Sequence, residues 1–497
     1  MQIDPRTPVI VGVAQITQRP DDPAEAMEPV ALMEHVVRAA ADDAGAPALA
    51  ASLDYVGVVQ GAWSYSDPAR LVADALGATG ARTAISANGG NTPQSYVNAL
   101  SARIAAGELD RAAIVGAEAI WSRRRQKRAG LDIARTAQTG VEPDERFGAD
   151  VPMTTEFENA RGMEQPINYY PLFDSAVRAS RGETIDEHRD RLAELWARFN
   201  EVAVANPYAW FRTPMTAAEI RDASPSNRMV GFPYTKSMNS NWDLDQGAAL
   251  LLCSAGAAEA AGVPRDRWVF PHAGTDAHDT YAVSARRDLH SSPAIAEAGR
   301  RLFELTGTGP DDVAHIDLYS CFPSAVQVAA AELGFDEDRR LTQTGGLTFA
   351  GGPLNNYVTH SIAAMVGVLR EHPGQVGLVS ANGGFLTKHA IGLYATEPGR
   401  GPFVAEDVQD VVDRVPTTPV DQAYAGSATI EAYTVMHGAE GAEVGLCALR
   451  TPDGARTWGR VVEPETAAAM TRTEMIGTEA ELGTDGALTL SRRSAKD

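Results

Sequence analysis

The sequence has only three cysteines, Cys253, Cys321 and Cys447, among its 497 residues, and it has no Cys-x-x-Cys pair. Three cysteines cannot build a disulfide framework, and without paired cysteines there is no metal-binding knuckle. The ten histidines show no metal-ligand spacing either. We therefore expect a protein of a reducing compartment that binds no metal ion.

Long hydrophobic runs are also missing. The longest apolar stretches, such as residues 362–369, are far shorter than the roughly 18 residues of a membrane-spanning helix. The N-terminal residues lack the basic start and apolar run of a secretory signal, and the C-terminal residues form no recognisable address signal. We expect a cytoplasmic protein with no membrane span.

Positive charge is scarce, because 43 Lys and Arg residues face 65 Asp and Glu residues and give a formal net charge of −22. Nucleic acids are bound through clustered positive charge, so this balance argues against general nucleic-acid binding. One segment departs from the trend, since five of the six residues at 123–128 are Lys or Arg. This segment is either a seat for a small polyanionic ligand or a solvated basic loop.

Two phosphate-binding signatures are absent as well. The chain has no Gly-Lys-Ser/Thr sequence of the Walker type, and its Gly-Gly-Asn turn is not the dinucleotide fingerprint. These absences disfavour a P-loop nucleotide hydrolase and a Rossmann dehydrogenase.

Strand-like and helix-like segments alternate along the first 120 residues. Residues 8–14, 55–59 and 112–118 are continuous apolar runs, typical of strands buried on both faces. Residues 28–41 and 94–107 carry apolar side chains at helical spacing. The alternation predicts an α/β fold with a largely interior sheet.

Part of this pattern occurs twice. A Gly-Gly pair followed by a Tyr-Val pair lies at 89–97 and recurs at 351–358. The strand-like run at 113–118 is matched in the same order by the run at 377–382. Because the separation between the copies is nearly constant, we predict a duplicated α/β unit.

The other segments differ from these halves in composition. Residues between the two copies are richer in charge and aromatics and include a strongly helical stretch at 186–204. Short β-type runs follow residue 404, two of them joined by a Thr-Pro-Asp-Gly turn at 451–454. The predicted parts are an N-terminal half (1–120 with 247–268), an inserted substrate or CoA domain (121–246), a C-terminal half (269–404), and a small β-barrel-like domain (405–497).

Four motifs in the same order resemble the thiolase superfamily. Residues 239–249 resemble the thiolase stretch that ends in Asp-Gly-Ala-Ala. Leu-Tyr-Ser-Cys-Phe at 318–322 lies where sterol-carrier-protein thiolases have His-Asp-Cys-Phe, and residues 345–353 resemble the stretch that contains Gly-His-Pro. Residues 380–385 occupy the Cys-x-Gly region. With its extra C-terminal part, the chain is most similar to thiolase-like proteins that carry an additional domain.

This resemblance implies a fold and a ligand. The fold would be an α/β, five-layered, duplicated thiolase fold of two βαβαβαββ halves. The ligand or substrate would be CoA or an acyl-CoA thioester, with no tightly bound cofactor. Thiolases commonly form homodimers through this core, and a monomer is the open alternative.

The catalytic side chains of thiolases are mostly missing from the matching positions. The nucleophilic cysteine corresponds to Gly89 within a residue or two, and the Gly-His-Pro histidine corresponds to Gly352. The Cys-x-Gly cysteine corresponds to Ala381. Only the cysteine of His-Asp-Cys-Phe remains, as Cys321, and Tyr319 stands where that motif has its histidine.

The candidate catalytic residues are therefore Cys321, Tyr319, His360 and His389. A histidine close to a cysteine can serve general acid–base chemistry, and we predict that His389 approaches Cys321. A structural role is the alternative for each histidine, as is simple burial for Cys321. The candidate CoA contacts are Arg123, Arg124, Lys236, Asn239, Asn241, Asn382 and Lys388.

Taken together, these residues predict a protein that handles CoA thioesters and resembles acetyl-CoA acetyltransferases. Conventional thiolase activity should be small, because the nucleophile and its activating histidine are missing. One alternative is a non-catalytic protein that binds or scaffolds acyl-CoA. Another is a retro-aldolase for CoA-linked side chains that uses Tyr319 and has its β-barrel partner in the same chain.

Overall fold

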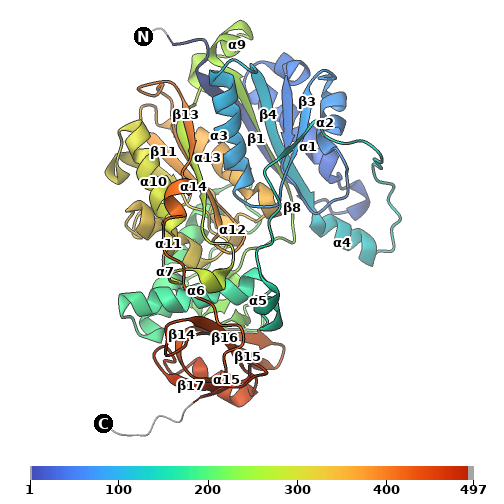
Figure 1. The fold of residues 1–497 in the computed structure, drawn as a ribbon. Helices are drawn as coiled ribbons and strands as arrows, with labels where there is room; N and C mark the ends of the chain where they lie inside the picture. The colour runs from blue at the N-terminus through green and yellow to red at the C-terminus, as the bar shows by residue number, and fades with distance from the viewer. Residues whose placement is uncertain (1–2, 491–497) are drawn as a thin grey trace.

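Two α/β halves, a layer of helices and a β-rich unit follow one another along the molecule (Figure 1). The computed structural model of the chain describes residues 3–490. The helical layer contains α5 (Glu156–Ala160), α6 (Pro166–Arg181) and α7 (Ile185–Ala205). It lies between the α/β halves and the C-terminal strands (Figure 1).

The first half is a six-stranded sheet that includes all three of the buried strands predicted in this region. The strand order is β1-β8-β4-β2-β3-β5, with β8 antiparallel to its neighbours β1 and β4 and with β2 parallel to β4. The strands are β1 (Pro8–Thr17), β2 (Tyr55–Val58), β3 (Arg82–Ser86), β4 (Arg111–Ala119), β5 (Glu145–Phe147) and β8 (Asp245–Ser254).

The second half repeats this topology. Its sheet runs β10-β11-β12-β9-β13, so that β9-β12-β11-β10 matches β1-β8-β4-β2 in order and in direction. The predicted duplication is confirmed. The predicted boundary after residue 404 falls inside β13, which pairs with β9. The strands are β9 (Phe270–His278), β10 (Val313–Asp317), β11 (Val376–Gly383), β12 (Lys388–Ala395) and β13 (Val404–Asp407).

Helices fill the space between the two sheets and cover their outer faces. The central helices α3 (Thr92–Ala105) and α13 (Tyr357–Glu371) each contact both sheets and bury their apolar residues there. The outer face of the first sheet is covered by α1 (Pro29–Asp43) and α2 (Pro68–Leu76). Outside the second sheet lie α10 (Pro293–Thr306) and α11 (Pro323–Leu333). The predicted five-layered fold is confirmed.

The segment between β4 and β8 supplies the helical layer. Its longest helix begins with a capping box in which Thr184 and Glu187 exchange hydrogen bonds, and it covers the predicted stretch at 186–204. The basic residues 123–128 form the end of a helix, and not a loop. The elements are α4 (Ile120–Arg128), α5 (Glu156–Ala160), α6 (Pro166–Arg181), α7 (Ile185–Ala205), α8 (Ala217–Arg221), β6 (Met229–Gly231) and β7 (Tyr234–Thr235).

A strand from the same segment covers one edge of the first sheet. The short strand β5 pairs in parallel with β3, from Ala84 with Glu145 to Ser86 with Phe147. An uncovered sheet edge is a template for a strand of another chain, and pairing within the chain removes it. Where β5 lies, β3 offers no free backbone ladder for a dimer through the core.

The C-terminal unit is an antiparallel sheet with strand order β16-β15-β14-β17-β18, and β6 of the insertion pairs with β14. The predicted turn at 451–454 connects β15 to β16, and Gly454 adopts a φ of 86° there. Within residues 3–490, one bridge between Arg460 and Ala487 links the two ends of this sheet, so no continuous ladder closes it. The elements are β14 (Gly426–Gly438), β15 (Gly441–Arg450), β16 (Arg456–Val461), α15 (Pro464–Met470), β17 (Glu479–Leu482) and β18 (Leu488–Leu490).

Three short helices complete the fold: α9 (Ala255–Ala260), α12 (Gly346–Phe349) and α14 (Gln409–Val412). Across residues 3–490, no helix combines the length and the apolar character needed to cross a bilayer.

Candidate functional site

The motif loops of both halves meet at a cavity of about 1050 Å³, which we call the main cavity. Its walls come from the turn before α3, the turn after β10, the segment after α12 and the end of β11. The insertion adds residues 150–153, the start of α6 and residues at 228–242. Segments far apart in the sequence therefore converge on one site, as the resemblance implied.

The turn before α3 brings Gly89 to the wall of this cavity. Gly89 is the position that corresponds to the nucleophilic cysteine of thiolases. Gly89 has a φ of 152°, and a Cβ atom there would lie only 2.9 Å from Nζ of Lys388. The Lys388 ammonium group donates a hydrogen bond to the carbonyl of Asn88. Burial lowers the pKa of Lys388, and the nearby charge of Asp150 opposes this shift. The space beside Gly89 is filled by the side chains of Asn91 and Lys388.

The turn at 239–242 packs against Gly352, the position that corresponds to the Gly-His-Pro histidine of thiolases. The backbone N–H of Gly352 donates to the carbonyl of Asn241 at 2.8 Å. A Cβ atom on Gly352 would collide with Oγ of Ser240. A side chain at 352 would therefore require the Ser240 hydroxyl to move.

Cys321 faces the cavity within a group of hydrogen-bonding side chains. Nδ2 of Asn382 lies 3.9 Å from Sγ of Cys321 and donates to the hydroxyl of Tyr170 at 2.9 Å. The Tyr170 hydroxyl donates to the carbonyl of Gly384 at 3.0 Å. Burial raises the pKa of Cys321 to about 12, although the hydrogen bond with Tyr170 acts in the opposite direction. Near neutral pH, Cys321 is a thiol and not a thiolate.

In the native protein, iodoacetamide should leave all three cysteines unmodified at neutral pH. Burial raises the pKa of Cys253, Cys321 and Cys447 to about 12 each, and only the thiolate form reacts. Mass spectrometry after a short incubation measures the modification, and the unfolded protein is the control in which all three cysteines react. Complete labelling of Cys321 in the native protein would contradict this prediction and would reveal a reactive thiolate in the main cavity.

Neither candidate histidine is among the residues that line the main cavity. His360 lies on α13, where its Nδ1 is 3.0 Å from Oε1 of Gln15, and burial lowers its pKa to about 3. His389 lies on β12 with Nε2 at 3.4 Å from Oδ2 of Asp279. The cavity wall brings Cys321 and Tyr319 together without either histidine, so the pairing of Cys321 with His389 stays a prediction.

The predicted CoA contacts separate into two groups. Lys236, Asn239 and Asn382 line the main cavity. Arg124 does not, and its guanidinium pairs with Asp243 at 2.7 Å. Arg123 lines a second, separate cavity. No residue of the basic segment 123–128 lines the main cavity, and Arg123 and Gln126 line the second cavity instead.

The remaining two predicted contacts, Lys388 and Asn241, are not among the residues that line the main cavity. Lys388 is the residue next to Gly89 described above, and it is mostly buried. Asn241 stands between Ser240 and Trp242, which both line the cavity, and its Oδ1 accepts from the N–H of Asp243 at 3.4 Å.

Sequence reasoning missed several wall residues of the main cavity. Nothing in the sequence indicated that Tyr170 lines a site, because its ring fits the apolar pattern of a buried helix face. Arg228 lies in the polar segment at 224–241, where its charge was a usable signal. Trp242 is 53% exposed beside Lys236, and an exposed tryptophan in a polar turn also points to a ligand surface. The missed wall residues include Tyr170, Arg228 and Trp242.

Among the residues that the structure describes, no group of three His, Cys, Asp or Glu side chains is arranged to hold a metal ion.

Comparison with known proteins relates the chain to thiolase-like proteins. Residues 407–487 match the family described as "Thiolase-like protein type 1 additional C-terminal domain". The crystal structure of a monomeric SCP2-thiolase like protein type 1 from Mycobacterium smegmatis is 33% identical. That similarity covers 98% of this chain and 100% of the other, with a TM-score of 0.85.

More distant relatives share the fold or a part of the sequence. The dimeric peroxisomal thiolase of Saccharomyces cerevisiae has a TM-score of 0.57 at 15% identity, covering 80% of this chain and 99% of that one. The acetyl-CoA acetyltransferase of Methanocaldococcus jannaschii is 26% identical over 136 residues, which are 27% of this chain. The aligned part spans only a third (33%) of that curated relative.

Proposed function

The chain belongs to the SCP2-thiolase-like proteins of type 1, and from this premise we propose that it binds a CoA thioester in the main cavity without forming an acyl-enzyme. The proposal rests on one observation: the main cavity has cations at its rim and the Tyr319 hydroxyl in its wall. The two positions where thiolases have their nucleophile and its histidine are both glycine, Gly89 and Gly352. The chain is also similar to acetyl-CoA acetyltransferases, through the relative from Methanocaldococcus jannaschii.

The rim of the cavity offers two cations for the phosphates of CoA. Arg228 and Lys236 are exposed, and the N–H of Lys236 donates to the carbonyl of Arg228 at 2.8 Å. In the described part of the chain, neither side chain pairs with a carboxylate. Charge-assisted hydrogen bonds to phosphate are about twice as strong as neutral ones. In a chain with a net charge of −22, two such free cations at a cavity favour a phosphorylated ligand.

The interior suits the rest of the ligand. Trp242, which lines the same cavity as the two cations, offers a ring on which adenine can stack. Further in, Ile167, Leu347 and Phe322 supply an apolar wall for the pantetheine arm and the acyl chain. Burial raises the pKa of Tyr319 well above its ordinary value, so its hydroxyl keeps its proton and can donate to the thioester carbonyl.

Two catalytic alternatives each require a side chain, Cys321 or Tyr319, to lose its proton. Acyl transfer through Cys321 needs a thiolate, and retro-aldol cleavage through Tyr319 needs a tyrosinate or an exchangeable proton. Burial raises the pKa of both groups. Product analysis with several acyl-CoAs distinguishes these alternatives from binding without turnover.

Titration calorimetry with acetyl-CoA tests the proposal. We expect saturable binding that weakens as salt is added, because phosphate contacts are screened by ions. The double variant Arg228→Ala/Lys236→Ala should lose at least about tenfold in affinity, which corresponds to one charge-assisted hydrogen bond. The matched control, Lys127→Ala/Arg128→Ala, removes the same charge from the exposed end of α4 and should bind like the wild type.

Two results would contradict the proposal. The first is the absence of binding heat at millimolar acetyl-CoA with the wild-type protein. The second is a reversed pattern, in which the control pair loses affinity and the pair at the cavity rim does not. The reversed pattern would instead assign the phosphates to the basic helix.

A further inference from the structure

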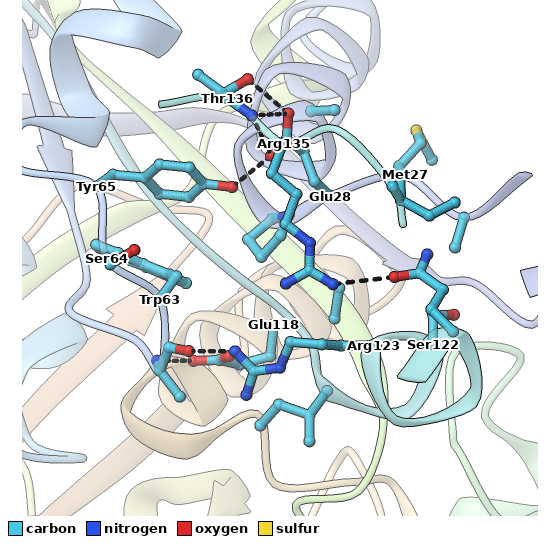
Figure 2. Close-up of a pocket in the computed structure, with 18 of the residues that line it drawn as sticks. Met27, Glu28, Trp63, Ser64, Tyr65, Glu118, Ser122, Arg123, Arg135 and Thr136 are labelled. Carbon is cyan, nitrogen blue, oxygen red and sulfur yellow. Dashed lines mark hydrogen bonds between the residues drawn. The ribbon is translucent and has the colours of Figure 1, made fainter. Parts of the chain in front are cut away.

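A second cavity, of about 310 Å³, lies at the C-terminal end of β4 and is lined by none of the residues that line the main cavity. It is enclosed by the start of α1, residues 62–65, the end of β4, the first turns of α4 and residues 133–136 (Figure 2). Neither the family resemblance nor the proposed function accounts for it.

Glu118 lies buried in the wall of this second cavity. It is the second-last residue of β4 and is only 2% exposed. Its Oε1 accepts a hydrogen bond from the N–H of Ala62 at 2.8 Å (Figure 2). Its Oε2 accepts no hydrogen bond from any residue in 3–490, and Glu118 lines the cavity. Burial raises the pKa of Glu118 to about 7, with the Ala62 N–H and the charge of Arg123 opposing the shift.

Two arginines point into the same space (Figure 2). Nη1 of Arg123 donates to the carbonyl of Ala62 at 3.0 Å, and Nη2 of Arg135 donates to Oε1 of Gln126 at 3.0 Å. Within the described ranges, neither guanidinium pairs with a carboxylate. The cavity wall also carries Glu28 and Glu118, but neither arginine forms an ion pair with them, so both guanidinium groups are free to bind an anion from outside the chain.

Glu28 is not available as a partner, because its carboxylate is already fully engaged. It accepts from the hydroxyl of Tyr65 at 2.8 Å and from Oγ1 of Thr136 at 2.6 Å (Figure 2). The N–H of Thr136 donates to the same carboxylate at 3.1 Å. These bonds fasten the segment after α4 to the cavity wall, which holds Arg135 over the opening.

We propose that the second cavity binds a small organic anion that carries a hydroxyl group next to its charged group. The carboxylate or phosphate of this ligand lies between Arg123 and Arg135, and its hydroxyl bonds to the unpaired oxygen of Glu118. A hydroxyl suits this position because it can donate to the ionised carboxylate or accept from the protonated one.

The size of the second cavity limits the ligand. Its volume is at the lower end of the roughly 300–1,000 Å³ of small-molecule sites, so CoA itself does not fit. The rings of Trp63 and Tyr65 provide an apolar wall for a short carbon skeleton. A ligand of a few carbons with an acid group and a hydroxyl group satisfies these limits.

Calorimetry at low ionic strength with three probes tests this inference. Glycerate and glycerol 3-phosphate each carry an acid group and hydroxyls, whereas propionate lacks the hydroxyl. Wild-type protein should bind one of the first two at least about tenfold more tightly than propionate, and the preferred probe identifies a carboxylate or a phosphate as the charged group. Arg123→Gln and Arg135→Gln should each weaken binding of that probe by about tenfold or more. Arg128→Gln, which removes an exposed charge from the same helix, should leave it unchanged.

Affinity for acetyl-CoA, measured on the same variants, shows that they are folded and keeps this test separate from that of the main cavity. It should not change in Arg123→Gln or Arg135→Gln. The inference is overturned if none of the probes binds at about 10 mM, if propionate binds as well as glycerate and glycerol 3-phosphate, or if both arginine variants keep the wild-type affinity.

Discussion

Thiolysis of acetoacetyl-CoA by this protein should be at least about 10⁴-fold slower than by a thiolase that forms an acyl-enzyme. Loss of a catalytic nucleophile alone typically removes that much rate or more. Here the matching position is Gly89, the matching histidine position is Gly352, and the Cys321 thiol stays protonated because burial raises its pKa to about 12. Consumption of free CoA and formation of two acetyl-CoA per acetoacetyl-CoA, followed by chromatography, measure the rate.

Restoring the cysteine should not restore the reaction, and this variant is the informative control. In Gly89→Cys, the new Cβ atom would lie 2.9 Å from Nζ of Lys388, at a φ of 152° that only glycine adopts readily. We expect Gly89→Cys to be less stable than the wild type and equally inactive. Turnover at a conventional thiolase rate by the wild-type protein would show that another side chain serves as nucleophile. Turnover by Gly89→Cys would show that the turn before α3 can rearrange.

Replacing Arg456 should be among the most destabilising single changes in the chain. This side chain has no exposed surface, and its Nε and Nη2 donate to the Glu431 carboxylate at 2.7 and 2.8 Å. Its Nη1 donates to the carbonyl of Ser284 at 2.9 Å, which ties the C-terminal sheet to the second α/β half. Removing one member of a buried ion pair usually costs about 3–5 kcal/mol, because the other charge is left without its partner.

Denaturant unfolding of Arg456→Met measures this loss of unfolding free energy. The control is Arg472→Met, an exposed arginine of the same domain, where we expect a change within about 0.5 kcal/mol. Hydrogen bonds from Arg456 hold the pKa of Glu431 below its ordinary value against the opposing effect of burial. A change in Arg456→Met no larger than that in Arg472→Met would mean that Arg450, the other partner of Glu431, is sufficient by itself.

The fold followed from two kinds of sequence signal. Buried strands such as β1 and β4 are continuous apolar runs, and the echo between 89–97 and 351–358 marks equivalent turns before α3 and α13. Pairing partners carried no such signal. Nothing in the three residues of β5 indicates that they cover the edge of β3, because a short exposed strand reads as loop.

Residues of the main cavity could be predicted only where they belong to loops with a recognisable motif. Cys321, Tyr319 and Asn382 belong to such loops, and the structure places them in the main cavity. Arg123 was assigned to CoA because five cations lie close together in the sequence, but charge spacing does not reveal which cavity a helix side chain enters. Its neighbour Arg124 is taken up by Asp243, more than a hundred positions away.

The most direct test of the main claim is a crystal structure of the protein soaked with acetyl-CoA. We expect an intact thioester in the main cavity, with its phosphates at Arg228 and Lys236, its carbonyl at the Tyr319 hydroxyl, and no bond to the protein. An acetyl group attached to Cys321, or CoA bound outside the main cavity, would contradict the account.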